Sequence, residues 1–256
     1  MADPRELEDA VAIVTGSVRG IGRAVALALA EDGADIAVHY HKDKDAAEQT
    51  AEGIRALGRR ALPVSAAVED TESLGRMAAT VEEELGPVSI LINNAGVASR
   101  GRSVAKTDAE ELERLMRIHA LGPHELCKRI LPGMRQQPRG DIVMVSSMAT
   151  KYNAAGGGPY NMGKAAMEAL AFTLAAEERR NGIRVNVVAP GLVETEMGRR
   201  LIKATAGVDD LRQIEDQMPF GRVCQPEDIA NTIRHLVSDR SAYTTGQRIG
   251  IDGGGQ

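Results

Sequence analysis

Three side chains capable of acid–base chemistry occur near the middle of the chain: the Ser147 hydroxyl, the Tyr160 phenol and the Lys164 ammonium group. A tyrosine and a lysine four positions apart on a helix lie on one face, about 5.4 Å apart along the axis. Because a nearby cation favours phenolate, Lys164 is expected to lower the Tyr160 pKa and make the phenol a usable proton donor or acceptor. The same spacing occurs in ordinary exposed helical pairs, so the motif alone identifies no site.

The composition is that of a globular protein without nucleic-acid or membrane character. The chain has 256 residues, 43% hydrophobic and 26% charged, enough for one large α/β domain or two small ones. A net charge of −5 and very few aromatic residues provide neither a basic field nor a stacking platform for nucleic acid. No apolar run reaches the roughly 18 residues of a membrane span.

Residues 1–9 and the two cysteines favour a cytoplasmic protein. Residues 1–9 are charged and lack an apolar signal region, so we expect a cytoplasmic location. Cys127 and Cys224 are far apart and form neither a CxxC pair nor a metal-ligand spacing. We therefore expect reduced thiols and no metal site.

A glycine-rich turn follows the first predicted strand. Residues 10–15 are an uninterrupted β-branched run, typical of a strand buried on both faces of a parallel sheet, and an Ala/Leu-rich helix is predicted over 23–32. Between them the sequence reads Gly16-Ser17-Val18-Arg19-Gly20-Ile21-Gly22. Such a turn lets the backbone approach a pyrophosphate, whose charge the free N–H groups of the helix stabilise. The spacing differs from Gly-x-Gly-x-x-Gly, so the strand–turn–helix setting carries the prediction of dinucleotide binding.

The tip of the second predicted strand, residues 33–40, favours NADP over NAD. A dinucleotide fold usually places an acidic residue there against the ribose 2′-hydroxyl. Here the tip reads His39-Tyr40-His41-Lys42, and Arg19 lies in the glycine turn. Without a carboxylate, this site would attract a 2′-phosphate. The alternative is a solvated charge cluster at a strand end.

The rest of the chain alternates between strands and helices. Strands are predicted at 61–66, 88–92, 140–147, 183–188 and 247–251, and helices at about 42–58, 70–85 and 159–180. Thr107-Asp108-Ala109-Glu110 has the pattern of a capping box that opens another long helix. We predict a single α/β domain over residues 1–256, a Rossmann-like doubly wound parallel sheet of about seven strands flanked by helices.

A histidine on this long helix points inward. His119 shares a helical face with Leu112, Leu115 and Met116. A lone histidine on such a face is usually a hydrogen-bonded core residue rather than part of a site. The pattern alone leaves both possibilities open.

Together these motifs resemble the short-chain dehydrogenase/reductase family over nearly the whole chain. The matching stretches are Thr15-Gly16-(x)3-Gly20-Ile21-Gly22, Asn93-Asn94-Ala95-Gly96, Ser147 with Tyr160-x-x-x-Lys164, Pro190-Gly191-Leu192-Val193-Glu194-Thr195, and Thr245-Gly246-Gln247 through Asp252-Gly253-Gly254. Within the family the sequence is similar to 3-oxoacyl-thioester reductases, including those acting on acyl-carrier-protein substrates, and to glucose-dehydrogenase-like members.

The resemblance implies hydride transfer between NADP(H) and a carbonyl or alcohol carbon. It implies that Ser147 hydrogen-bonds the substrate oxygen, that Tyr160 gives it a proton, and that Lys164 binds the nicotinamide ribose and lowers the tyrosine pKa. It places Val193 and Thr195 at the carboxamide and a nearby phosphate, with Pro190 and Gly191 before them. It also places Asn94, Ala95 and Gly96 on the adenosine side, with Ala67 and Val68 near the adenine.

The chain departs from the family pattern at two of these positions. His119 stands where the family has Asn, the fourth member of its catalytic set. The main-chain carbonyl there holds a relay water, so we expect the relay to survive, although the His119 ring, with a reference pKa near 6.5, could also join it directly. Ala67 replaces an Asp that accepts a hydrogen bond from the adenine amine, and Glu69 or Asp70 could substitute for it.

Substrate identity is the least readable feature. Residues 196–218 have the length and mixed polarity of the family's substrate lid, and Met197, Leu201, Ile202 and Leu211 either line an apolar pocket or pack as an ordinary amphipathic face. The first hypothesis is an NADPH-dependent carbonyl reductase with 3-oxoacyl thioesters as one candidate substrate. The alternatives are a sugar or secondary-alcohol dehydrogenase and a catalytically weak nucleotide-binding sensor. The resemblance also implies a homotetramer.

Overall fold

Seven parallel strands form the centre of the structure, a computed structural model that describes residues 6–254. The strands are β1 (Val11–Val14), β2 (Asp35–Tyr40), β3 (Ala61–Ser65), β4 (Ile90–Asn93), β5 (Gly140–Val145), β6 (Ile183–Pro190) and β7 (Arg248–Ile251). Their order across the sheet is β3-β2-β1-β4-β5-β6-β7. The direction of strand addition reverses between β1 and β4, which confirms the predicted doubly wound, Rossmann-like α/β fold.

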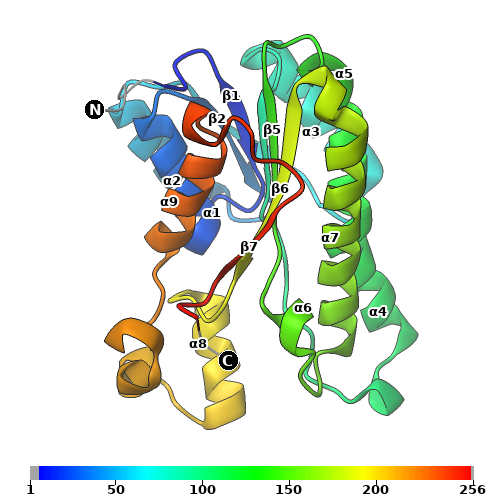
Figure 1. Cartoon of the computed structure of the whole chain (residues 1–256), viewed down its shortest axis with the longest axis vertical. Coiled ribbons are helices and arrows are strands. Elements are labelled where there is room, and N and C mark those ends of the chain that lie inside the picture. The colour runs from blue at the N-terminus through cyan, green and yellow to red at the C-terminus, as the bar shows by residue number, and fades with distance from the viewer. Residues whose placement is uncertain (1–5, 255–256) are drawn as a thin grey trace.

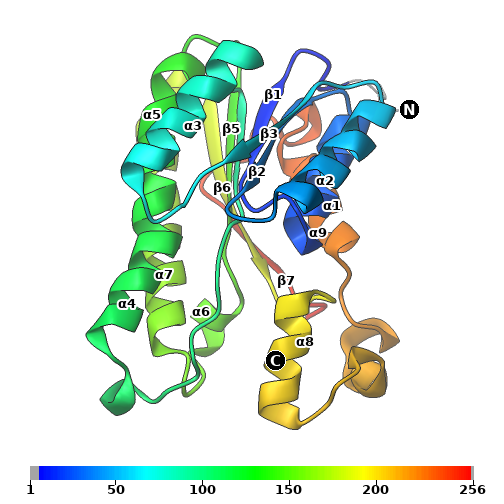
Figure 2. The same ribbon diagram turned by 180° about the vertical axis from the view of Figure 1, so that it is seen from behind.

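Helices cover both faces of the sheet (Figures 1 and 2). One layer contains α1 (Gly20–Glu31), α2 (Lys44–Ala56) and α9 (Pro226–Leu236), and the other contains α3 (Thr71–Glu84), α4 (Ala109–Met116), α5 (Gly122–Met134) and α7 (Gly158–Glu178). The short α6 (Ala149–Tyr152) and α8 (Glu196–Ala206) lie beyond the carboxyl ends of the strands. Among the described residues, no helix is long and apolar enough to cross a membrane.

The central strands are buried at every residue. This holds for β1, β4, β5 and β6, as their unbroken apolar character predicts. Two aliphatic cores, one on each face, pack the sheet against its helices. In a sheet covered on both faces, ligands bind beyond the carboxyl ends of the strands.

The fifth strand is shorter than predicted. It ends at Val145, so Ser146 and Ser147 follow the strand rather than belonging to it. The Ser147 hydroxyl accepts a hydrogen bond from the Ala149 N–H at the start of α6, at 3.1 Å. The chain therefore turns away from the sheet at Ser147.

The predicted capping box at residues 107–110 does not form. The α4 helix begins after Asp108, whose side chain makes no capping bond and instead pairs with Arg102 at 2.6 Å. The Thr107 hydroxyl donates to the Ser103 carbonyl at 3.0 Å. The arginine competes for the carboxylate that would otherwise cap the helix.

The long helix predicted from residue 107 is interrupted. A π-helical turn, Arg117–Leu121, separates α4 from α5 and contains His119. Pro123 in the first turn of α5 has no N–H and so cannot close the α-helical bond to the carbonyl four residues earlier, which is that of His119. Such turns are frequent at functional sites.

Candidate active site

Ser147, Tyr160 and Lys164 lie together at the carboxyl edge of β5. Ser147 follows this strand, while Tyr160 and Lys164 are one turn apart on α7. The Ser147 hydroxyl acts on the Tyr160 phenol as a polar neighbour that lowers its pKa. The Lys164 ammonium donates to the Val145 carbonyl at 2.6 Å, and its Nζ lies 5.9 Å from the centre of the Tyr160 ring. The structure therefore brings the three residues into one site.

Burial dominates the electrostatics of Tyr160. It raises the pKa of the phenol, and the hydrogen bond from Ser147 opposes this shift. The direction differs from the sequence-based expectation, because removal of the phenolate from water outweighs a nearby cation in the protein alone. The phenol is thus held in its protonated form, ready to donate.

The Lys164 ammonium is almost fully buried, with 3% of the residue exposed. Burial lowers its pKa to about 8, and the negative charge of Glu168, one turn further along α7, opposes the shift. At neutral pH the group therefore remains largely protonated. It supplies a positive charge inside the site.

His119 packs against the tyrosine as a neutral ring. Its imidazole meets the Tyr160 ring edge-on, with centroids 5.3 Å apart, and its Nε2 lies 2.9 Å from the Val97 carbonyl. Burial, and then the charge of Lys164, lower the His119 pKa to about 3. The prediction that it points inward is confirmed, but titration near its reference pKa of 6.5 is not available to it.

The second ring nitrogen of His119 is a buried acceptor. With Nε2–H donated to Val97, Nδ1 carries a lone pair, and within residues 6–254 no polar atom pairs with it. A Cβ built on Gly96 would lie 3.3 Å from this Nδ1 and 3.6 Å from Lys164 Nζ. Gly96 thus keeps open the space between the two groups.

The glycine turn has the shape that a dinucleotide pyrophosphate requires. Gly16 and Gly20 have φ values of +67° and +51°, and a Cβ on Gly22 would lie 2.2 Å from the Gly16 carbonyl oxygen. The α1 helix starts after Arg19 without a side-chain cap, so its first N–H groups are free for an anion. These residues fit the predicted cofactor.

His39 holds this turn rather than contacting a phosphate. Its Nδ1 accepts a hydrogen bond from the Gly16 N–H at 2.9 Å, and its Nε2 lies 3.0 Å from the Ala66 carbonyl. Burial lowers the His39 pKa to about 4, so the ring is neutral at physiological pH. The expectation that His39 draws in a 2′-phosphate by charge is corrected: the ring is 2% exposed and structural.

Asn94 and Thr15 fasten the turn from its other side. The Asn94 amide donates to the Thr15 carbonyl at 2.8 Å and to that of Gly16 at 3.3 Å. The Thr15 hydroxyl accepts the N–H groups of Asn94 and Ala95, both at 2.9 Å. The motif after β4 therefore lies beside the cofactor turn, as expected.

Arg19 and Tyr40 are the other two residues that the sequence predicts to contact a 2′-phosphate. Arg19 is exposed and pairs with Glu196 at 2.8 Å and with Asp43 at 3.7 Å. Tyr40 ends β2 and is half-buried. Both ion pairs are at the surface and hence weak, so the guanidinium can exchange them for a phosphate.

Ala67 and Val68, which are expected near the adenine, are both half-buried after β3. The Ala67 N–H donates to the Ser73 hydroxyl at 3.2 Å. Asp70 caps α3 by accepting the Glu72 N–H at 3.0 Å. The Asp70 Oδ1 is therefore used to cap α3, and Ala67 itself has no side-chain acceptor for the adenine amine.

The segment after β6 approaches the glycine turn. The strand ends at Pro190, and the Gly191 N–H donates to the Ile251 carbonyl at 2.9 Å. Val193 is buried, and Thr195 caps α8 through the Gly198 N–H at 3.1 Å. A Cβ on Gly20 would lie 3.1 Å from Thr195 Cγ2, so these residues adjoin the expected phosphates.

The apolar residues of 196–218 divide between two roles. Leu211 is buried in a small core of its own, against which Ile202 packs. Met197 and Leu201, one turn apart on α8, are 41% and 54% exposed. Only this second pair is free to meet a substrate.

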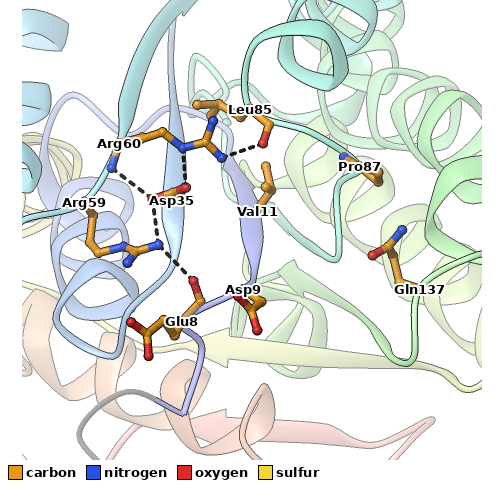
Figure 3. Close-up of a pocket in the computed structure, with 9 residues that line it drawn as sticks. All are labelled: Glu8, Asp9, Val11, Asp35, Arg59, Arg60, Leu85, Pro87 and Gln137. Carbon is orange, nitrogen blue, oxygen red and sulfur yellow. Dashed lines mark hydrogen bonds and ion pairs between the residues drawn. The ribbon is translucent and has the colours of Figure 1, made fainter.

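A separate cavity of about 410 Å³ opens at the opposite end of the strands (Figure 3). Asp35 lines this cavity and forms ion pairs with Arg59 at 2.9 Å and with Arg60 at 2.6 Å. These ion pairs join the starts of β2 and β3. The cavity contains none of the predicted site residues.

Comparison with known proteins agrees with this geometry. A family model described as enoyl-(acyl carrier protein) reductase matches residues 16–256. The 3-oxoacyl-[acyl-carrier-protein] reductase FabG of Staphylococcus epidermidis is 35% identical over 244 residues, covering 95% of this chain and 97% of that protein. The chain therefore belongs to the short-chain dehydrogenase/reductase family of oxidoreductases, as its motifs indicate.

Solved structures of related reductases have the same fold. L-sorbose reductase from Gluconobacter frateurii, complexed with NADPH and L-sorbose, is 29% identical, with a TM-score of 0.90 and 98% coverage of each chain. The angucycline C-6 ketoreductase LanV with bound NADP is 32% identical, with a TM-score of 0.87, covering 97% of this chain and 96% of that one.

Three residues of the site were not predicted from the sequence. Thr15 was assigned only to a strand and a family motif, yet its buried hydroxyl anchors the loop after β4. Glu168 and Arg248 lie next to the catalytic serine but are 80 positions apart in the chain. The spacing of Glu168 one helical turn after Lys164 was the available signal.

Proposed function

We propose that this protein is an NADPH-dependent carbonyl reductase that acts on 3-oxoacyl thioesters. The observation that carries the proposal is the arrangement of Ser147, Tyr160 and the buried Lys164 beside a glycine turn shaped for a dinucleotide. When bound, NADPH supplies the hydride to the carbonyl carbon. The chain's own residues bind the substrate oxygen and provide its proton.

Ser147 and Tyr160 are the groups that would hold and protonate the substrate oxygen. The Ser147 hydroxyl lies beside the phenol, so an oxygen that accepts from both would be placed for protonation. Burial keeps Tyr160 protonated before the reaction, and Lys164 stabilises the phenolate that forms when the proton leaves. The proton is then replaced from the Lys164 side of the site.

His119 and its carbonyl would serve this proton replacement. The ring Nδ1 is an unpaired acceptor facing the same space as the Lys164 ammonium. Pro123 removes the α-helical donor of the His119 carbonyl. Either acceptor would hold a water beside Lys164, which preserves the relay that the family's Asn provides.

The thioester substrate is supported by the relatives and by α8. Several related proteins, including the one from Staphylococcus epidermidis, are 3-oxoacyl-[acyl-carrier-protein] reductases. Met197 and Leu201 present an exposed apolar pair on α8, at the carboxyl end of the sheet. We assign residues 196–218 as a substrate lid whose apolar pair covers the acyl chain.

A ketose or polyol is the second candidate substrate, supported by the similarity to L-sorbose reductase. A panel of a 3-oxoacyl thioester, a ketose and simple ketones, followed at the nicotinamide absorbance band with NADPH, tests both. Highest kcat/KM with the thioester supports the first candidate. The highest kcat/KM with the ketose would show that the second candidate is correct and the thioester proposal is wrong. Firm NADPH binding without turnover of any substrate would instead indicate a nucleotide-binding sensor.

We further propose a cytoplasmic homotetramer. Met162 and Phe172 on α7 are 53% and 40% exposed, and Ala165 and Ala169 lie between them on the same outer face. This apolar face suits packing against α7 of a second copy. Both cysteines are free, which suits a reducing compartment. Light scattering of the parent and of Phe172→Glu would test the assembly, and a monomeric parent would refute it.

A further inference from the structure

A polar network joins the last strand of the sheet to the catalytic serine. The Arg248 guanidinium on β7 pairs through Nε with the Glu168 carboxylate on α7 at 3.1 Å, and its Nη2 donates to the Ser147 carbonyl at 3.2 Å. The same Nη2 lies 2.9 Å from the Thr150 hydroxyl. Arg248 thus contacts both the helix that carries Tyr160 and the turn that carries Ser147.

Glu168 on α7 is the second charged residue of this network. Its carboxylate accepts hydrogen bonds from the Ser146 hydroxyl at 2.5 Å and the Thr150 hydroxyl at 2.8 Å. The Glu168 and Arg248 side chains are only 13% and 24% exposed. Because these charges are largely removed from water and each has several partners, the network constrains the turn at Ser147 more than a surface ion pair could.

We propose that Glu168 and Arg248 are positioning residues: their ion pair fixes the backbone of Ser147 and holds the Glu168 carboxylate one helical turn from the Lys164 ammonium. The inference rests on the proposed reductase function for its kinetic part. Its electrostatic part concerns the protein alone.

The groups around Lys164 leave Glu168 as its source of negative charge. On α7, Tyr160 precedes Lys164 by one turn and is protonated, and Glu168 follows by one turn. From the π-helical turn, His119 faces it as a neutral ring, and from β5 the Val145 carbonyl accepts its proton. Arg248 on β7 is hydrogen-bonded to Glu168 through its Nε. Glu168 raises the Lys164 pKa against the effect of burial.

Glu168→Gln and Arg248→Met separate the two roles. Both should lower kcat about 10-fold with little change in KM for NADPH, because both loosen the turn at Ser147. Their effects on the Lys164 pKa should differ. Glu168→Gln should lower the pH at which Lys164 loses its proton by roughly half a unit to one unit. Arg248→Met should leave it unchanged or raise it, because Ser146 and Thr150 still hold the carboxylate.

The proton on Lys164 can be followed without substrate by NMR of the protein carrying isotopically labelled lysine, with the signal assigned by its loss in Lys164→Arg. Glu178→Gln is the matched control, because Glu178 is a buried partner of Arg135, at 2.5 Å, at the far end of the same helix. It should leave kcat per folded molecule and the Lys164 titration unchanged.

Two results would overturn the proposal. One is an unchanged Lys164 titration in Glu168→Gln together with parental kcat per folded molecule. The other is an equal effect from Glu178→Gln, which would show that any buried pair on α7 has this influence. If the parent reduces no carbonyl substrate, the proposed function fails, yet the Lys164 titration still decides the electrostatic part.

Discussion

His119 shows how burial changes what a residue can do. A histidine in water titrates near neutral pH, but here the ring is inaccessible to solvent and faces the Lys164 charge. The protonated form is therefore excluded, and the residue is left with one donor and one acceptor. Its chemistry is that of an oriented hydrogen-bonding group, comparable to the Asn that the family has at this position.

This assignment predicts the behaviour of His119→Asn. We expect kcat to change by less than about 10-fold, because the amide supplies the same two functions. The pH profile between 5 and 9 should keep the apparent pKa values of the parent, since the His119 pKa of about 3 lies outside that range. Steady-state rates across this range test it, and a lost ionisation near pH 6.5 would show that the ring takes up protons itself.

We expect Tyr160 to govern the pH dependence in both reaction directions. Burial raises its pKa, so the protonated phenol that reduction needs is present at neutral pH and is lost only as pH rises through that pKa. Reduction should therefore weaken, and alcohol oxidation strengthen, on the alkaline side. Tyr160→Phe should lower kcat at least about 100-fold in both directions. A reduction rate that rises, or an oxidation rate that falls, on the alkaline side would contradict this role.

We expect Arg19 to determine cofactor preference, because the neutral His39 offers no charge. Arg19→Ala should reduce kcat/KM for NADPH about 10-fold or more with a small change for NADH. Tyr40→Asp should likewise shift the cofactor preference towards NADH. His39→Gln is the contrasting variant, because it affects both cofactors equally through the turn. Equal losses with both cofactors in Arg19→Ala would refute the assignment.

At the scale of elements, periodicity and turn chemistry predicted most of the fold. The predictions of the strand–turn–helix unit around Gly16 and of the alternating strands and helices were correct, because each depends on a local sequence pattern. The failed capping box at residue 107 and the shortened β5 depended on partners distant in the chain or on competing hydrogen bonds. Likewise, the buried charge of Glu168 is stabilised by Arg248 from another strand, a contact that no local pattern contains.

The π-helical turn is the element whose sequence cause can be tested most directly. Pro123→Ala restores an N–H that can bond the His119 carbonyl and favours a regular α-helix. We expect equal or greater stability but a several-fold lower kcat, because the carbonyl is withdrawn from the site. Thermal unfolding and steady-state kinetics measure the two effects. Lower stability with unchanged kcat would assign Pro123 a purely structural role.

At the scale of the whole molecule, the buried histidines link stability to acidity. The His39 pKa falls from 6.5 to about 4 on folding, so its contribution is fully present above pH 6.5 and is lost as pH falls towards 4. The shift corresponds to roughly 3 kcal/mol of unfolding free energy. Urea unfolding at neutral and acid pH should show this loss. His39→Gln should be less stable at neutral pH but show a weaker pH dependence, and an equally steep fall would exclude His39 as its source.

The hydrogen bond from the Gly16 N–H to His39 has a further kinetic consequence. The turn takes its shape from Thr15, His39 and Asn94, all contributed by the protein, so little conformational entropy remains to be lost when a dinucleotide arrives. Association should therefore be a single fast step limited by encounter, whereas a loosened turn would bind through a slower, saturable isomerisation. Stopped-flow binding would show which residues prepare the site in advance.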